Sequence, residues 1–288
     1  MIRREQEPLK AHTTFRIGGP AKYYFVPEKE EEIKEALNFA REQKLPFYVI
    51  GKGSNILFSD QGYDGVIIEI GKGLEKIEIW EDGMVTAQAG ISLAQMASKL
   101  AAAGFTGFEF ASGIPGTLGG GIAMNAGAYG GEMKDCIQRA KVLTPDGHIL
   151  ALEKDELELG YRTSVIQRQD YLVLEGEFAF GRGETEAIQA QMRELNQKRR
   201  DKQPLEYPSA GSTFKRPEGY FAGKLIEDAG LSGYRVGDAQ VSEKHCGFVV
   251  NRGQATAAEV AQLIRDVQDE VMKKYGVKLE PEVRMIGF

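Results

Sequence analysis

The stretch PSAGSTFKRPEGYFAGKLIEDAG, from Pro208 to Gly230, places a serine between a glycine and a threonine and follows it with two cations. Ser212 in this setting has four chemical interpretations: a nucleophile, a phosphate ligand, a proton donor or a residue of a turn. Lys215 and Arg216 lie close enough along the chain to bind an anion beside it. The residue types alone leave all four roles open.

The sequence gives little support for a serine-hydrolase triad or for a metal site. A Ser–His–Asp triad needs a histidine base, and the chain offers only His12, His148 and His245, while Ser212 stands outside a G-x-S-x-G motif. A triad with one of these histidines, distant in sequence from Ser212, stays open. Neither an HExxH nor a CxxC spacing is present, so we expect no metal site.

The two usual phosphate-binding loops are also missing. GYFAGKL has the wrong spacing for a Walker loop and carries no hydroxyl after Lys224. GKGSNI and GGGIAM both lack the third glycine of the dinucleotide fingerprint. A chain with many glycines after its strands is therefore predicted to bind phosphates by another device.

The chain has two long glycine-rich regions that could bind phosphates in place of these loops. They are IGKGSN and GIPGTLGGGIAMNAGAYG. Successive backbone N–H groups in such turns can form an anion-binding nest, and glycine lets a flat ligand approach the backbone closely. One glycine turn is usually only a turn, but two long regions favour a large cofactor.

The elements that must position these residues alternate between helices and strands. AKYYFVP, a helix with apolar Ile33, Ala36, Leu37 and Ala40, and PFYVI predict a strand–helix–strand unit that leads into the first glycine loop. IEIWEDGMVTAQAG predicts a hairpin turning at Asp82-Gly83, and a second strand pair surrounds TPDGHI. Ser92 is expected to cap a helix that ends at Gly104.

The last third of the chain is mixed. ETEAIQAQMRELNQKRRDK predicts a helix with a basic end, broken by Pro204, and a domain boundary falls near residue 201. Thr256 and Glu259 form a capping-box pattern for a helix that Gly276 ends. VKLEPEVRMIGF is expected to close the chain as a strand.

Composition narrows the class of protein. The 288 residues suggest two or three domains, and a net charge of −6 argues against a nucleic-acid binder. We see neither an apolar run of membrane-spanning length nor the apolar core of a signal peptide, which predicts a cytoplasmic protein without membrane insertion. Cys136 and Cys246 are expected to be reduced thiols.

The ordered set of motifs resembles UDP-N-acetylenolpyruvoylglucosamine reductases. It comprises HTTFRIGGPA, GKGSNIL, GIPGTLGGGIAMNAGAYGGE, GYRTS, PSAGSTFKRP, AGLSGYRVGDAQVSEKHCGFVVN and LEPEVR, and it covers nearly the whole chain. The family uses FAD and NADPH to reduce UDP-N-acetylglucosamine-enolpyruvate to UDP-N-acetylmuramate in bacterial peptidoglycan synthesis. At this length the chain resembles the shorter subtype, which lacks a substrate-covering tyrosine loop.

The resemblance implies an α+β fold with a vanillyl-alcohol-oxidase-type FAD-binding domain in two lobes and a C-terminal α+β substrate-binding domain. We expect lobe 1 at residues 1–70, lobe 2 at 71–200 and the substrate domain at 201–288. The expected partners are the UDP-sugar and NADPH, and the expected state is a monomer or weak oligomer.

Three catalytic residues follow from the resemblance. Arg162 matches the arginine that stabilises negative charge on the substrate, Ser212 the proton donor, and Glu282 the catalytic glutamate. An ionised carboxylate would oppose a developing anion, so Glu282 is expected to be protonated or neutralised by an arginine when it acts. Glu280 is a less favoured candidate. The plain alternatives are a surface arginine in a turn and an exposed acid on a terminal strand.

The binding residues are carried over in the same way. The expected FAD contacts are Gly51, Lys52, Gly53, Ser54, Asn55, Ile56, Gly113, Ile114, Pro115, Gly116, Gly120, Gly121, Asn125, Gly127, Ala128 and Tyr129. The expected substrate contacts are Tyr161, Lys202, Lys215 and Arg216, where many members have asparagine in place of Arg216. The RRDK segment could equally be a basic helix end favoured by the helix dipole. His245 is expected to be a packed, hydrogen-bonded histidine.

Two other functions would explain parts of this pattern. An oxidase of the same flavin superfamily often tethers FAD through a histidine in the first glycine loop, and GKGSN has none. A non-catalytic sugar-nucleotide binder would keep the glycine and basic loops without needing Arg162, Ser212 and Glu282 together.

Overall fold

The computed structural model describes residues 1–288 and divides into two compact units. The first unit contains residues 1–4, 24–52 and 65–199, and the second contains residues 5–23, 53–64 and 200–288. Each unit therefore combines stretches that are distant in sequence.

The predicted strand–helix–strand unit is confirmed. Its elements are β2 (Pro20–Val26), α1 (Glu30–Glu42) and β3 (Phe47–Ile50), with Ile33, Ala36, Leu37 and Ala40 buried on one face of the helix. β3 pairs in parallel with β5 (Tyr63–Glu69), in a sheet ordered β1-β2-β5-β3 whose first strand is β1 (Ile2–Pro8). The first glycine loop thus follows directly from the end of β3.

A five-stranded sheet dominates the rest of the first unit, in the order β12-β11-β13-β7-β6. Its strands are β6 (Ile77–Ile79), β7 (Met84–Gln88), β11 (Ile137–Leu143), β12 (Ile149–Glu153) and β13 (Leu172–Ala179). β6 and β7 form the predicted hairpin, because Gly83 adopts a φ of 87° that its turn requires. β11 and β12 form the pair predicted around TPDGHI.

Short elements surround the second glycine region. They are α2 (Leu93–Ala102), β8 (Phe105–Thr106), a 3-10 turn (Glu109–Ala111), α3 (Leu118–Ala123), β9 (Gly127–Ala128), β10 (Gly131–Glu132), a second 3-10 turn (Met133–Asp135), α4 (Val165–Arg168), β14 (Gly181–Arg182) and α5 (Thr185–Lys202). Ser92 caps α2 with a capping box that includes Gln95, as its position predicts. α3 packs against β13, which ties the glycine region to the sheet.

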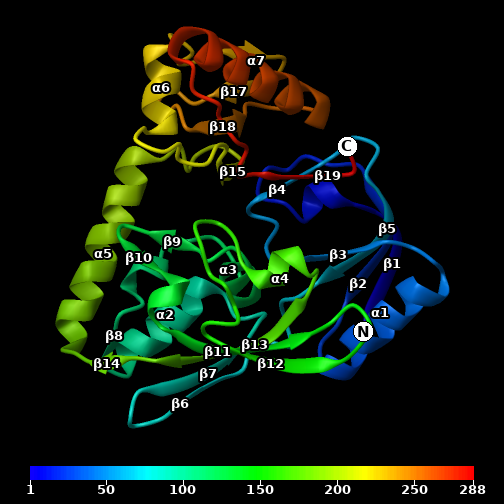
Figure 1. The fold of residues 1–288 in the computed structure, drawn as a ribbon, viewed down its shortest axis with the longest axis vertical. Helices are drawn as coiled ribbons and strands as arrows, with labels where there is room; N and C mark the ends of the chain where they lie inside the picture. Colours follow the sequence, from blue (N-terminus) through cyan, green and yellow to red (C-terminus); the bar gives the residue numbers. More distant parts are fainter. The chain divides into compact units, whose positions relative to one another are not determined.

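The second unit is built on the sheet β15-β18-β17-β16. Its elements are a 3-10 turn (Leu9–Ala11), β4 (Ile56–Phe58), β15 (Ser209–Ser212), α6 (Ala222–Asp228), β16 (Arg235–Val236), β17 (Ala239–Val241), β18 (Phe248–Asn251), α7 (Ala257–Tyr275) and β19 (Arg284–Ile286). Figure 1 shows α7 packed on this sheet, where it contacts β16 and β17, with α6 beside it. Phe15, Ile17 and Leu57 join the C-terminal residues in this unit's buried core.

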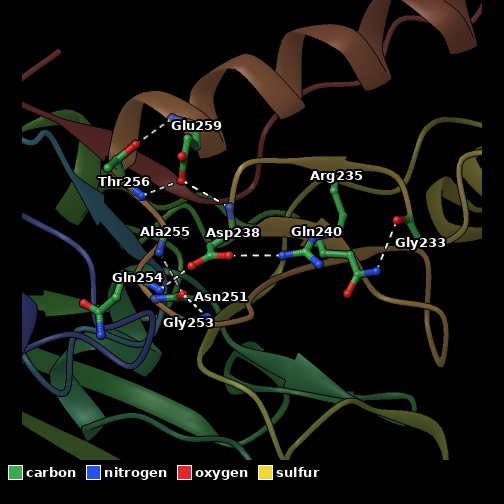
Figure 2. A network of polar contacts seen from close by, with 10 residues as sticks. All are labelled: Gly233, Arg235, Asp238, Gln240, Asn251, Gly253, Gln254, Ala255, Thr256 and Glu259. Atoms are coloured by element: carbon green, nitrogen blue, oxygen red, sulfur yellow. Dashed lines mark hydrogen bonds and ion pairs between the residues drawn. The ribbon is translucent and has the colours of Figure 1, made fainter.

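The start of α7 is fixed by a network of polar contacts (Figure 2). Thr256 and Glu259 form the predicted capping box, and Asn251 Oδ1 accepts from the N–H groups of Gly253 and Ala255 at 3.0 Å each. Gly276 ends the helix with a φ of 66°, as expected for a left-handed cap. The helix boundaries predicted from the sequence are therefore confirmed at both ends.

The last strand is shorter than the sequence suggests. Only Arg284–Ile286 forms β19, which pairs in parallel with β4, while Pro281 makes a single bridge to Phe214. Proline has no N–H to donate, so it cannot continue a ladder. No helix has both the length and the apolar character needed to cross a membrane.

Candidate active site

Ser212 lies at the end of β15, opposite Phe248 of β18. The register shifts between Ser209 and Ser212, where Gly211 adopts a φ of 75° that a side chain would disfavour. The next residue, Thr213, is buried and donates its N–H to Gly247 O at 2.8 Å, while its Oγ1 accepts from Val249 N at 3.0 Å. The half-buried Ser212 hydroxyl is therefore carried by a tightly held backbone.

Glu282 belongs to a segment that runs beside Ser212 and Lys215. Glu282 N donates to Thr213 O at 2.8 Å, and Lys215 N donates to Glu280 O at 2.8 Å. Asn55 Nδ2 donates to Glu282 O at 3.1 Å. The second unit therefore brings together the segments of four residues predicted for the site, Asn55, Ser212, Lys215 and Glu282, from positions far apart in the chain.

Glu280 and Glu282 differ in surroundings. Lys215 Nζ lies 3.5 Å from a Glu280 carboxylate oxygen, and the side chain of Glu280 is 62% exposed. The side chain of Glu282 is half-buried. Glu282 is therefore the more enclosed of the two residues, and its backbone is the one that pairs with Thr213.

The cations near Ser212 are presented differently. The Arg216 guanidinium carbon lies 3.9 Å from the centre of the exposed Phe221 ring, and Arg216 Nε donates to Tyr220 O at 3.3 Å. Lys202 ends α5 and is exposed. The stacking on Phe221 orders Arg216, so Arg216 is a positioned cation close to Ser212 in the chain.

His245 is a packed, hydrogen-bonded histidine, as predicted. Its Nδ1 accepts from Gly247 N at 3.1 Å, and its ring meets Phe248 edge-on with centroids 5.1 Å apart. Burial, with a smaller contribution from the charge of Lys202, lowers the pKa of His245 below its usual 6.5. The neutral ring therefore supports the Gly247 backbone that holds Thr213.

Arg162 stands in a turn of the first unit with a φ of 56°. Its Nη2 donates to Gly127 O at 3.1 Å and its Nη1 to Asn125 O at 3.4 Å. The guanidinium carbon lies 5.2 Å from the ring centre of the neighbouring Tyr161, whose side chain is exposed. The second glycine region thus holds the guanidinium through its main chain.

The two glycine-rich regions meet at Gly51. An added Cβ on Gly51 would collide with the Thr117 hydroxyl, so only glycine allows this approach. Gly120 and Gly130 instead leave exposed backbone, since a Cβ on Gly130 would meet nothing within 4 Å. Bare backbone next to a half-buried surface suits a flat, extended ligand, so the residues of this region fit FAD.

The other residues predicted for the cofactor divide between the units. Gly113, Ile114, Gly116, Gly121, Gly127 and Ala128 are half-buried or buried, and Lys52, Pro115 and Tyr129 are exposed, all in the first unit. Gly53, Ser54 and Ile56 belong to the second unit, where Thr14 N donates to Gly53 O at 3.2 Å.

Two residues next to the predicted site, both threonines, were not among the residues expected from the sequence. Thr117 contacts Gly51, and Thr213 holds the Ser212 and Glu282 segments together. Arg199, the first residue of the basic RRDK segment, lies against Gly113, and burial lowers the pKa of its guanidinium. A threonine next to a predicted site glycine or serine was the only available signal, because each contact joins residues distant in the chain.

Two family profiles match the chain. Residues 203–286 match the C-terminal domain of UDP-N-acetylenolpyruvoylglucosamine reductase, and residues 21–153 match an FAD binding domain. The second match covers both glycine-rich regions and ends with β12, before the turn that carries Arg162.

Relatives are similar along nearly the whole chain. A UDP-N-acetylenolpyruvoylglucosamine reductase of Lachnoclostridium phytofermentans is 57% identical over 284 residues, which is 98% of this chain and 92% of the relative. One of Agathobacter rectalis is 55% identical over 294 residues, covering 98% of this chain and 93% of the relative. The crystal structure of the Thermus caldophilus reductase superposes with a TM-score of 0.83 at 34% identity, covering 99% of this chain and 98% of that one.

Proposed function

Because the chain belongs to the UDP-N-acetylenolpyruvoylglucosamine reductase family, we propose that it reduces UDP-N-acetylglucosamine-enolpyruvate to UDP-N-acetylmuramate with electrons from NADPH. It is an FAD-dependent UDP-N-acetylmuramate dehydrogenase, a flavoprotein oxidoreductase of cell-wall synthesis. Its length supports the shorter subtype. The observation that carries the finer proposal is the pairing of the Ser212 segment with the Glu282 segment.

Bound FAD supplies a hydride relay between NADPH and the substrate. The residues proposed to hold it lie in the two glycine-rich regions and are residues 51–56, 113–116, 120, 121, 125 and 127–129. Their support is the close approach of Gly51 to Thr117 and the match of residues 21–153 to an FAD binding domain.

The reaction forms two C–H bonds across the enol ether. A hydride adds to the terminal carbon, and the electron pair of the double bond moves to the carbon that bears the carboxylate. Ser212 Oγ–H donates the proton that completes the second C–H bond, and solvent returns a proton to the serine. A hydroxyl is a weak acid, but a developing carbanion is basic enough to take its proton.

Arg162 stabilises the charge that spreads onto the substrate carboxylate. The carbonyls of Gly127 and Asn125 fix its guanidinium, so little reorganisation is needed as charge develops. Tyr161 next to it is proposed to contact the substrate. Glu282 acts in its protonated or neutralised form beside Ser212.

The diphosphate requires local positive charge on a protein with a net charge of −6. Lys202, Lys215 and Arg216 are proposed to supply it. Arg216 is ordered by stacking on Phe221, and Lys215 follows Ser212 on the segment that pairs with Glu280–Glu282.

The deciding experiment follows the yellow colour of the purified protein without oxygen. NADPH should bleach it, and UDP-N-acetylglucosamine-enolpyruvate should then restore it with formation of UDP-N-acetylmuramate. The proposal would be overturned if the protein took up no FAD, or if the enol ether did not reoxidise its reduced form. A sugar-nucleotide binder would bind the substrate without the colour change, and an oxidase would be reoxidised by oxygen alone.

A further inference from the structure

Asn125 lies in the second glycine region, and its side chain is completely buried. Its Nδ2 donates to Glu132 Oε2 at 2.6 Å and to Gly160 O at 3.0 Å. Its Oδ1 accepts from Lys134 N at 2.9 Å. Both donors and the acceptor of the amide are therefore engaged inside the first unit, and the backbone N–H of Asn125 donates to Ile122 O at 3.0 Å.

Gly160 is the first residue of the turn that carries Arg162. Gly160 and Thr163 exchange backbone hydrogen bonds of 3.1 and 3.4 Å, which close this turn. Because Asn125 Nδ2 donates to Gly160 O, the side chain of Asn125 is bonded to the residue at which the turn begins. The main-chain oxygen of the same asparagine accepts from Arg162 Nη1 at 3.4 Å. One residue thus touches both the backbone that carries the arginine and the guanidinium itself.

We propose that Asn125 is the positioning residue for Arg162. It clamps the Gly160–Thr163 turn with its side chain and directs the guanidinium with its carbonyl. The inference rests on the proposed role of Arg162 and deepens it, because it names the residue that sets the arginine's place. A second tether supports the clamp: Ser164 Oγ donates to Ala123 O at 2.7 Å, which anchors the far side of the turn to the end of α3.

Asparagine meets three requirements at this position. Its φ of 42° lies in the left-handed region, which asparagine tolerates better than most residues. The two acceptors require an NH2 group, and Lys134 N requires an oxygen. Glutamine has both groups but is one methylene longer, and aspartate would set a second carboxylate against Glu132.

The test separates the two half-reactions by stopped-flow without oxygen. In Asn125→Asp, reoxidation of the reduced enzyme by UDP-N-acetylglucosamine-enolpyruvate should slow by about 10- to 100-fold, because small misplacements of a catalytic group have effects of that order. Reduction by NADPH and the FAD dissociation constant should change by less than about threefold. Gln138→Glu makes the same amide-to-acid change on an exposed side chain of this unit and should leave both rates unchanged.

A double-mutant cycle distinguishes positioning from general damage. In an Arg162→Ala background, Asn125→Asp should slow reoxidation by less than about twofold, because its effect passes through the arginine. Adding Glu132→Gln to Asn125→Asp should restore part of the rate, since the glutamine amide can donate to the new carboxylate. An undiminished effect in the Arg162→Ala background, or equal slowing of both half-reactions, would overturn the inference.

A milder variant covers the case in which Asn125→Asp does not fold. Glu132→Ala removes one acceptor of the amide and should slow only reoxidation, by about threefold to tenfold, as expected for a loosened catalytic group; an unchanged rate would count against the clamp. If Arg162→Ala itself leaves reoxidation intact, the proposed role of Arg162 has failed, although the proposed reduction of the substrate has not. If Arg162→Ala slows it and Asn125→Asp does not, only the positioning role has failed.

Discussion

Two neighbouring hydroxyls, Ser212 and Thr213, have different environments. Thr213 is 3% exposed, and its oxygen accepts from Val249 N, so it serves the backbone. Ser212 is half-buried at the end of β15, next to the segment of Glu282. Adjacent residues of nearly the same chemistry thus provide a matched pair for testing which one acts as the acid.

Ser212→Ala should slow reoxidation by substrate by roughly 10²- to 10⁴-fold, the usual contribution of a general acid. Flavin reduction by NADPH should remain within about threefold of the original rate, because that half-reaction needs no proton from this serine. Thr213→Ser, which keeps the oxygen bonded to Val249 N, is the control. Stopped-flow traces in which both half-reactions slow equally would remove Ser212 from its proposed role.

Glu282→Gln and Glu280→Gln test the choice between two acids. The first should lower turnover by at least about tenfold if the carboxyl acts as a proton donor. The second should have a smaller effect, because Glu280 is exposed and faces Lys215. Steady-state kcat for the two variants decides the matter, and a larger loss for Glu280→Gln would show that the assignment is reversed.

At the scale of elements, the sequence correctly predicted the helix ends and turns that depend on neighbouring residues. The capping boxes at Ser92 and Thr256, the left-handed Gly276 and the hairpin at Gly83 all follow from residues a few positions apart. The contacts that assemble the site join distant residues: Gly51 with Thr117, Asn55 with Glu282, and Asn125 with Gly160. The family resemblance supplied the site residues, but spacing could not supply their partners.

Asp60 is one such unpredicted partner. Its carboxylate accepts from Ala257 N at 2.8 Å and Ala258 N at 2.9 Å, so it adds negative charge to the first turn of α7. Asp60→Ala should lower the free energy of unfolding by about 1 kcal/mol, as expected for a lost helix cap. Urea denaturation measures it, and Asp64→Ala is the control.

Asp64 pairs with Lys22 at 2.9 Å, and its side chain is 86% exposed. Its removal should change stability by less than about 0.5 kcal/mol. Equal losses in the Asp60 and Asp64 variants would mean that the carboxylate of Asp60 contributes nothing beyond ordinary surface charge.

At the scale of the whole molecule, the compact units differ from contiguous stretches of sequence. The predicted division at residues 70 and 200 assigns residues 5–23 and 53–64 to the first lobe, whereas these residues cluster with residues 200–288. The predicted lobes remain a hypothesis about the cofactor domain. Local sequence patterns cannot reveal that an N-terminal segment packs with the C-terminal residues. The contacts of Phe15, Ile17 and Leu57 with the C-terminal core depend on packing between residues distant in the chain.

A fragment of residues 200–288 should therefore not fold by itself. It lacks three buried apolar side chains, each stabilising by about 1.5–3 kcal/mol, which together approach the whole stability of a typical domain. It also lacks β4, the partner of β19. Near-ultraviolet circular dichroism through a urea titration should show no cooperative transition, and a sharp transition would show that the C-terminal residues suffice.

The net charge of −6 would repel an anionic substrate if the whole molecule set the field. We expect the local cations Lys202, Lys215 and Arg216 to dominate instead. Raising the ionic strength from about 0.02 to about 0.3 M shortens the screening length from roughly 20 Å to roughly 6 Å. The second-order rate constant for reoxidation by the UDP-sugar should then fall by about tenfold, as for electrostatically steered association.

Dithionite-reduced enzyme is the reagent for this measurement, because it keeps the charge of NADPH out of the experiment. The Lys202→Gln/Lys215→Gln double variant should show a lower rate constant and a weaker dependence on salt, since fewer cations remain to be screened. A rate constant that rises with salt would mean that the overall negative charge governs the approach of the substrate. The diphosphate would then have to be bound by groups other than these cations.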